Sequence, residues 1–304
     1  MTKTLLLVMM LLVTVVGGEV AATREDTDQF IAGILRADGT LVPFAHYGNG
    51  GWTNPWPRPR QPPTSIYDEE PQEVVPHSLG DLPEPWFKQC GKISKKWYFR
   101  TSAQTSQVLK ASEVLQVENH SQTNWALMTD FPKQNTNDTH HRNIGIALNV
   151  NLKVEPVMQI QVSTPEAVEI LSFVRKAFEN AGNADLKTLY RSSLRVNREY
   201  LYYFEAETQR RKAPGSRDEG CNDISLFQGW ISADEKSGMG LLDSRVFLTD
   251  CDMKGPSFTT PLGIMKLNDT TYLFASEHGW EDESYLILGL DNSGLYKVLE
   301  TFGG

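Results

Sequence analysis

Apolar and polar residues alternate most regularly toward the C-terminal end of the sequence. Short apolar runs at residues 262–267, 271–276, 284–290 and 295–302 are separated by turn-forming residues such as Asn268 and Asp269. Polar turns of this kind let an antiparallel chain reverse its direction. The pattern predicts a four-stranded meander at residues 258–302, about the size of one propeller blade.

A similar hairpin is predicted near the other end of the sequence. The apolar runs 30–35 and 41–44 flank Asp38 and Gly39, and an Asp-Gly pair between apolar runs is a strong hairpin signal. Two similar hairpins at opposite ends of a chain suggest a closed ring in which the last blade meets the first. The alternative is that the two segments look alike only because hairpins share one layout.

Further strands are expected between these segments, because apolar, β-branched and aromatic residues are frequent there. They are expected at residues 96–100, 107–119, 126–128, 143–152, 154–162 and 198–209, followed by a hairpin at 224–233 and 241–248. The runs 143–152 and 154–162 are expected to pair with each other.

One segment, at about residues 164–181, has the period of an amphipathic helix. Thr164 suits the N-cap and Pro165 suits the first helical position. Apolar residues then recur at intervals of three and four, and Gly182 is expected to end the helix. A second, short helix is expected at residues 184–191.

These elements predict a mostly β fold of antiparallel meanders, propeller-like, with a large β-sandwich as the alternative. Residues 23–304 are expected to form a single domain. Residues 52–85 hold most of the 16 prolines, and prolines at this density exclude both helix and central strand. We expect this proline-rich stretch to run across the surface.

Residues 1–22 have the order of a secretory signal peptide. Lys3 is followed by an apolar run at residues 5–16 and by small residues that end at Ala22. The run is shorter than the roughly 20 residues that span a bilayer. We expect a secreted or periplasmic protein with no integral membrane segment after cleavage, and an uncleaved anchor is the alternative.

The net charge limits the class of binding partner, and the cysteine content limits the expected disulfide and metal binding. The net charge of -9 argues against nucleic acid, which requires a basic face. Of the three cysteines, Cys221 and Cys251 bracket the expected hairpin at 224–248, so a disulfide between them is expected, with two buried thiols as the alternative. No pair has C-x-x-C spacing, so metal binding by cysteine is not expected.

Two polar clusters beside tryptophan residues are the candidate ligand-binding positions. They are Glu118, His120, Gln122, Asn124 and Trp125 with His140, His141 and Arg142, and then Glu277, His278 and Trp280. Amides and charges give direction to a polar or sugar-like ligand, and an indole ring offers it a flat face. The alternative is solvated loops. Without an H-E-x-x-H or comparable motif, we expect neither a metal nor a cofactor.

The sequence contains no G-x-S-x-G elbow, P-loop or dinucleotide-binding motif. We therefore expect an exported protein that binds a polar ligand or an envelope protein without catalysis. The first alternative is a secreted or periplasmic hydrolase acting on glycans, with Glu118 and His120 near its centre. The second is a structural or assembly protein of the envelope.

Overall fold

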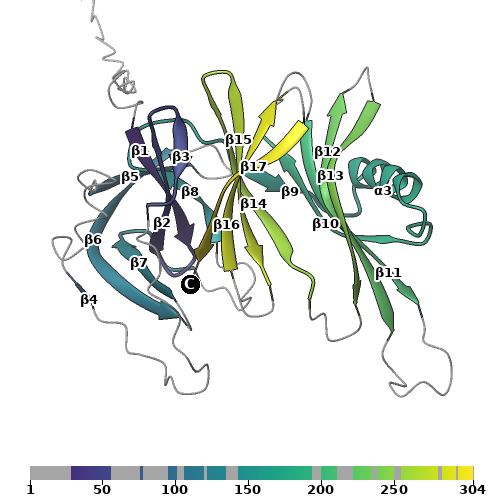
Figure 1. Ribbon diagram of the computed structural model, residues 1–304, viewed down its shortest axis with the longest axis horizontal. Helices are drawn as coiled ribbons and strands as arrows, with labels where there is room; N and C mark the ends of the chain where they lie inside the picture. Colours follow the sequence, from purple (N-terminus) through teal and green to yellow (C-terminus); the bar gives the residue numbers. More distant parts are fainter. Residues whose placement is uncertain are drawn as a thin grey trace, which may run out of the picture.

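A computed structural model of the chain describes residues 29–55, 76–77, 95–100, 106–119, 122–134, 143–193, 200–210, 222–234, 238–249, 255–279, 283–291 and 294–303. In these ranges the chain forms antiparallel strands in three sheets, together with one α-helix (Figure 1). The mostly β fold expected from the sequence is confirmed.

The first sheet closes on itself. Its members are β1 (Gln29–Arg36), β2 (Thr40–Gly48), β3 (Gly51–Thr53), β4 (Pro76–His77), β5 (Lys96–Arg100), β6 (Ser106–Asn119), β7 (Gln122–Thr129) and β8 (Asn143–Leu148). Six of them follow the order β1-β8-β5-β6-β7-β2, and β1 also pairs with β2, which completes the ring. The predicted turn joins β1 to β2: Gly39 has φ +85°, and Asp38 Oδ1 accepts a hydrogen bond from Thr40 N at 2.9 Å.

Apolar side chains fill the inside of this closed sheet. The cluster takes members from all six strands of the ring, including Ile31, Leu41, Trp97, Leu109 and Leu127. Neighbouring positions on β1 and β2, such as Phe30 and Phe44, point outward instead, because successive residues of a strand face opposite sides. The closed sheet thus has a packed interior and a second apolar surface on its outside.

The predicted C-terminal meander forms the second sheet. It consists of β14 (Phe258–Leu267), β15 (Thr270–His278), β16 (Glu283–Asp291) and β17 (Gly294–Gly303), paired in sequence order. Asn268 takes φ +55° in the turn between β14 and β15. This left-handed conformation favours asparagine and glycine, which explains the predicted turn.

The meander packs against the outer surface of the closed sheet. Phe274 of β15 lies 6.3 Å from Phe44 and 5.7 Å from Trp52, measured between ring centroids. Tyr285 of β16 lies 5.7 Å from Phe44. The first hairpin and the last meander are therefore in contact, as predicted, and they meet as two sheet faces packed on each other.

The third sheet lies on the other side of the meander. It has the order β13-β12-β11-β10-β9, with β9 (Val157–Gln159), β10 (Asp185–Ser192), β11 (Tyr200–Arg210), β12 (Asp223–Asp234) and β13 (Gly238–Thr249). β13 contacts β17, while β9 and β10 contact β14. The predicted strand at 198–209 and the hairpin at 224–248 are confirmed.

Helix α3 (Pro165–Ala177) covers the outer face of this third sheet (Figure 1). As predicted, Thr164 is the N-cap, and its Oγ1 accepts a hydrogen bond from Ala167 N at 3.2 Å. The expected end at Gly182 is wrong, because Phe178 already leaves the helix. Its half-buried ring packs against Phe227, with 5.3 Å between the ring centroids.

The expected helix at 184–191 is also wrong, since these residues form β10. Leu186 and Leu189 are three residues apart, a helical spacing, yet both are buried under α3. The pairing of β10 with β11 shifts register between Leu186 and Thr188, where a bulge inserts one residue. Because the bulge adds one residue, Leu186 and Leu189 face the same side of the sheet although they are three residues apart.

The expected pairing of 143–152 with 154–162 is wrong as well. β8 pairs with β1 and β5 in the closed sheet, whereas β9 pairs with β10 in the third sheet. Between them, Glu155 forms an isolated bridge to Ile264 of β14. The segment therefore crosses from one sheet to another.

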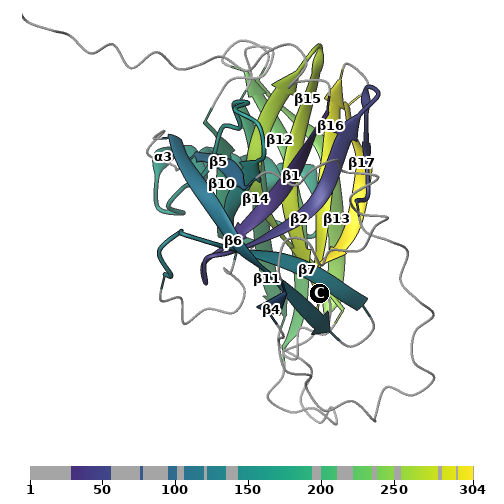
Figure 2. The ribbon, with the colours of Figure 1, turned by 90° about the vertical axis from the view of Figure 1, so that its left-hand side faces the viewer.

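The three sheets and α3 form consecutive layers (Figure 1), and the view turned by 90° shows β1 and β2 lying across the strands of the meander (Figure 2). This stacking resembles the sandwich alternative more closely than a ring of equal blades. Among the described residues, no helix is long and apolar enough to cross a membrane.

Replacing Phe274 with alanine should destabilise the whole protein, because this buried ring joins the meander to the closed sheet. We expect a loss of about 3–5 kcal/mol in the free energy of unfolding, measured by urea denaturation. The control Val108→Ala changes a side chain that is half exposed and should cost no more than about 0.5 kcal/mol. Equal effects of the two substitutions would contradict this account of the interface.

Candidate functional site

The structure tests only part of the two predicted polar clusters. His120, His140, His141, Arg142 and Trp280 lie outside the described residues, as do Cys221 and Cys251. For Glu118, Gln122, Asn124 and Trp125 the structure describes the backbone, which forms the ends of β6 and β7. Glu118 lies opposite Thr123 there. The polar segment is thus largely a strand hairpin and not a long loop.

Glu277 and His278 are neighbours on β15, and they contact different sheets. Glu277 forms an ion pair with Arg245 of β13, on the side of the third sheet. His278 lies opposite Glu283 of β16, on the side of the closed sheet. Adjacent strand residues face opposite sides, so these two side chains do not form one site.

The His278 side belongs to a polar network between the closed sheet and the meander. Arg36 Nη2 donates to Glu283 Oε2 at 3.2 Å and to the Tyr285 hydroxyl at 2.6 Å, and Asn143 Nδ2 donates to Glu283 Oε1 at 2.6 Å. Burial alone would lower the pKa of Arg36, but Tyr285 and Glu283 outweigh it and raise that pKa above its ordinary value. The network joins the two sheets beside the aromatic contacts, because Tyr285 takes part in both.

A second buried carboxyl group lies between the third sheet and the meander. Glu205 Oε1 accepts a hydrogen bond from the Tyr203 hydroxyl at 2.9 Å, and this hydroxyl accepts one from Thr259 N at 3.3 Å. Burial raises the pKa of Glu205 above its ordinary value. Burial, with the nearby Glu205 charge, raises the pKa of Tyr190 to about 12. A raised carboxyl pKa occurs in general acids, but this group is enclosed between two packed layers.

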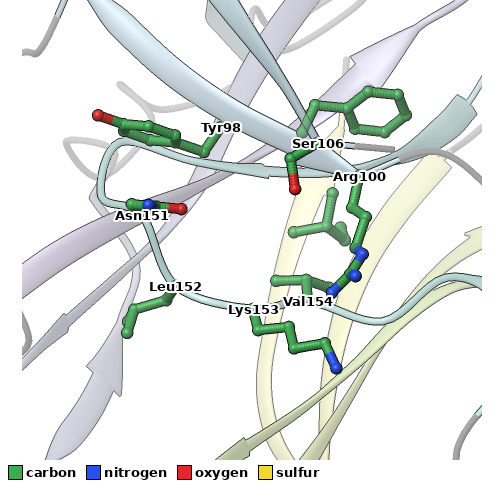
Figure 3. A pocket seen from close by; sticks show the side chains of 9 residues that line it. Tyr98, Arg100, Ser106, Asn151, Leu152, Lys153 and Val154 are labelled. Carbon is green, nitrogen blue, oxygen red and sulfur yellow. The ribbon is translucent and has the colours of Figure 1, made fainter. Parts of the chain in front are cut away.

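The candidate site is a cavity of about 370 Å³ beside β5 (Figure 3). Residues of β5, β6 and β8 and of the segment 151–154 after β8 surround it. The lining consists of Tyr98, Phe99, Arg100, Ser106, Ile146, Asn151, Leu152, Lys153 and Val154. β5 turns Trp97 and Phe99 toward the packed interior of the closed sheet, so its alternate residues Tyr98 and Arg100 face the other way.

Two cations and one carboxylate form one end of the cavity. Arg100 Nη1 lies 3.4 Å from Glu155 Oε1, and Lys153 Nζ pairs with the same oxygen. The Glu155 side chain is 3% exposed, against 22% for Arg100 and 59% for Lys153. The carboxylate is therefore hidden behind the two cations, and the exposed part of this group is positive.

The backbone beneath this group is fixed to the meander. Glu155 N donates to Ile264 O, Ile264 N donates to Glu155 O, and both distances are 2.8 Å. Figure 3 shows Arg100 and Lys153 at one end of the cavity and Tyr98 and Asn151 at the other, with Ser106 between them. Charge thus gathers at one end, while the hydrogen-bonding and aromatic groups of Tyr98 and Asn151 lie at the opposite end.

Among the described residues that line the cavity there is no carboxyl group, histidine or cysteine. In the described ranges, no set of three or more His, Cys, Asp or Glu residues could hold a metal ion. The arrangement can bind, orient and partly desolvate a ligand.

Sequence reasoning missed this cavity. The pattern predicts only an aromatic strand at 96–100 and two strands at 143–152 and 154–162, with Lys153 between them. The available signal was the alternation of Tyr98 and Arg100 on β5 and the pair Lys153 and Glu155 two residues apart. The pairing of β5 with β8 brings the two segments together.

Comparisons of the chain with models of protein families, with curated proteins and with solved structures find no match.

Glu205→Gln should change how stability depends on pH. Because its pKa is raised in the folded protein, folded Glu205 binds more protons than the unfolded chain between its ordinary value of 4.5 and the raised pKa. The stability that Glu205 contributes is therefore complete below that ordinary value and is lost as pH rises through the window.

Glutamine does not titrate, so the stability of Glu205→Gln relative to the unmodified protein should increase as pH rises from about 4 toward 7. Urea unfolding across this range measures the difference. The control Glu169→Gln alters an exposed residue of α3 and should show no such trend. A constant difference for Glu205→Gln would contradict the burial argument.

Proposed function

We propose that the protein is an exported binding protein that holds a small polar ligand, without converting it, in the cavity beside β5. The observation that carries the proposal is the composition of that cavity. The cavity is lined by two cations, by the polar groups of Tyr98, Ser106 and Asn151, and by apolar side chains. The apolar side chains are those of Ile146, Leu152 and Val154. Polar groups that give a ligand its orientation, placed beside apolar side chains, are typical of ligand sites.

The fixed position of the charged groups supports binding. Arg100 and Lys153 are both paired with Glu155, whose backbone is hydrogen-bonded to Ile264 on a neighbouring sheet. A site whose groups are already in place loses less conformational entropy when a ligand arrives.

Binding is favoured over glycan hydrolysis because the described residues that line the cavity include no carboxyl group. Most glycosidases place two carboxyl groups on either side of the bond that they cleave. The nearest one, Glu155, is almost completely buried and paired with two cations. The hydrolase alternative depends on Glu118 and His120, for which the described part of the chain includes only the Glu118 backbone.

Export is included in the proposal because of residues 1–22, whose charged start, apolar core and small-residue end are typical of a secretory signal. A binding protein outside the cytoplasm would meet small polar molecules directly.

A second candidate function, assembly, is favoured by the edge of the third sheet. β13 is the outer strand of that sheet in the described structure. Its Leu248 is 83% exposed and its Val246 is 50% exposed. Val246 lies opposite Phe227 of β12, which packs under α3. The exposed side chains of Val246 and Leu248 therefore lie on the face of the third sheet that α3 covers, one strand beyond β12. Soluble proteins usually protect such edges, because unpaired strands join other chains.

A second copy of the chain is the partner that this edge suits. Antiparallel pairing of two β13 strands about a two-fold axis at Val246 would place Val246 against its own mate and Leu248 against Ser244. In this register Arg245 would oppose Phe247 and Asp243 would oppose Thr249, so that no like charges oppose each other.

The binding proposal predicts that at least one small polar molecule raises the melting temperature. A thermal-shift panel of sugars, sugar acids, amino acids and divalent ions should contain a compound that stabilises the protein with a saturable dose response. Lys153→Gln should weaken that response, whereas Lys187→Gln should not, because Lys187 forms a comparable ion pair with Glu207 on the third sheet. No shift with any compound would count against the binding function.

The assembly candidate predicts a dimer that depends on β13. Light scattering after size exclusion at about 100 µM should give the dimer mass, and the double substitution of Val246 and Leu248 by lysine should give the monomer mass, because charged edge strands do not pair. Both side chains are exposed, so the variant should retain its fold, which circular dichroism can check. A monomeric unmodified protein would reject this candidate.

A further inference from the structure

The chain contains the pattern Asn-x-Ser/Thr, which accepts N-linked glycans, at residues 119–121, 137–139 and 268–270. Of these three segments, only 268–270 lies wholly within the described residues, where it forms the turn between β14 and β15. We infer that Asn268 is the attachment site of an N-linked glycan. This inference rests on the proposed export of the chain and does not depend on the ligand of the cavity beside β5.

The turn presents its asparagine to solvent. Leu267 pairs with Thr270, so Asn268 and Asp269 are the two residues that reverse the chain, and both are exposed. Asn268 has φ +55°, a left-handed conformation that asparagine adopts more readily than most residues. Thr270, whose hydroxyl completes the acceptor pattern, is half-buried at the start of β15. Both groups of the pattern therefore lie at the surface of one tight turn.

The tip of this hairpin lies apart from the other candidate surfaces. Figures 1 and 2 show it at the upper end of the meander, away from the C-terminus. None of residues 268–270 lines the cavity beside β5 or belongs to β13. A glycan on Asn268 is thus attached outside both the ligand site and the edge considered for assembly.

Glycan transfer to Asn268 forms one bond and breaks another. The donor is an oligosaccharide linked to a lipid diphosphate, which an exported chain meets in the lumen of the secretory pathway. The side-chain amide nitrogen of Asn268 bonds to the anomeric carbon of the sugar and loses one proton. The bond from that carbon to the diphosphate oxygen breaks, and the lipid diphosphate leaves. The product carries a bulky, polar group, which suits an exposed turn of an exported protein.

Another turn of the chain provides a matched control. Asn49 is exposed and has φ +53°, and it is the first of the two residues between the paired Gly48 and Gly51. Gly51 stands where the first turn has Thr270, so this turn has the geometry without the acceptor pattern. A Cβ added at Gly51 would meet no described atom within 4 Å, so a threonine fits there.

Expression of the full chain in insect cells tests the inference. Peptide N-glycosidase converts a glycosylated asparagine to aspartate, and in heavy-oxygen water the new carboxyl group is labelled. We expect mass spectrometry of the secreted protein to find this label at residue 268. Thr270→Ala should abolish the label and Thr270→Ser should retain it, because the acceptor pattern requires a hydroxyl at this position.

Two further variants separate the pattern from the turn. Asn268→Asp also suits a left-handed turn, but it has no amide nitrogen to accept the sugar, so the label should be lost while the secreted amount is unchanged. Gly51→Thr should add a label at Asn49, where the unmodified chain has none. Circular dichroism of the secreted variants checks that each retains the fold.

Each contrary result has a distinct meaning. A secreted protein without the label at residue 268 would overturn the glycan assignment and leave export and binding standing, and a label confined to residues 119 or 137 would do the same. If the chain does not reach the medium, export and this inference both fail, while the thermal-shift panel still tests binding. A label at Asn268 in Thr270→Ala would show that the acceptor pattern does not decide attachment, and it would also overturn the assignment.

Discussion

The stacking of the C-terminal meander on the N-terminal hairpin is the contact on which the other layers depend. The meander is the middle layer, and strand alternation gives it two apolar faces. On β15, Phe274 packs toward Phe44 of the closed sheet, while its neighbour Leu273 packs with Tyr203 and Trp230 of the third sheet. The meander therefore joins the closed sheet to the third sheet, whose other face packs on α3. Contacts so distant in sequence carry a large loop-closure cost, and the aromatic surface buried there offsets it.

The candidate site is a consequence of this layering. The chain leaves the closed sheet after β8 and has to cross to β9 in the third sheet, past the middle layer. On the way, Glu155 pairs with Ile264 of β14, which fixes the crossing segment beside β5. Backbone in such a crossing is not committed to a sheet on both sides, so its side chains can line a cavity. Lys153 is thus fixed near Arg100 by an element that the fold requires for another reason.

Features that depend on neighbouring residues were predictable from the sequence. The Asp38-Gly39 turn, the meander and the N-cap at Thr164 each follow from local chemistry, and each is found. Features that depend on distant partners were not. Leu186 and Leu189 have a helical spacing only because a bulge lies between them, and β8 finds its partners far away in the sequence. The cavity combines both difficulties, because Arg100 and Lys153 meet only through the pairing of β5 with β8.

The fate of Glu277 and His278 shows why a polar cluster in a strand was a poor guide to the site. Their side chains point to opposite faces of the meander, where Glu277 pairs with Arg245 and His278 faces Glu283. In a protein made of stacked sheets, consecutive polar residues of a central strand are divided between two interfaces, where they are used to join layers. Residues two apart behave differently, since they share a side. Lys153 and Glu155 are two apart in an extended crossing segment, and they converge on one ion pair at the edge of a cavity. Binding groups in such a fold are therefore expected where the chain passes between layers and not within the strands that those layers bury.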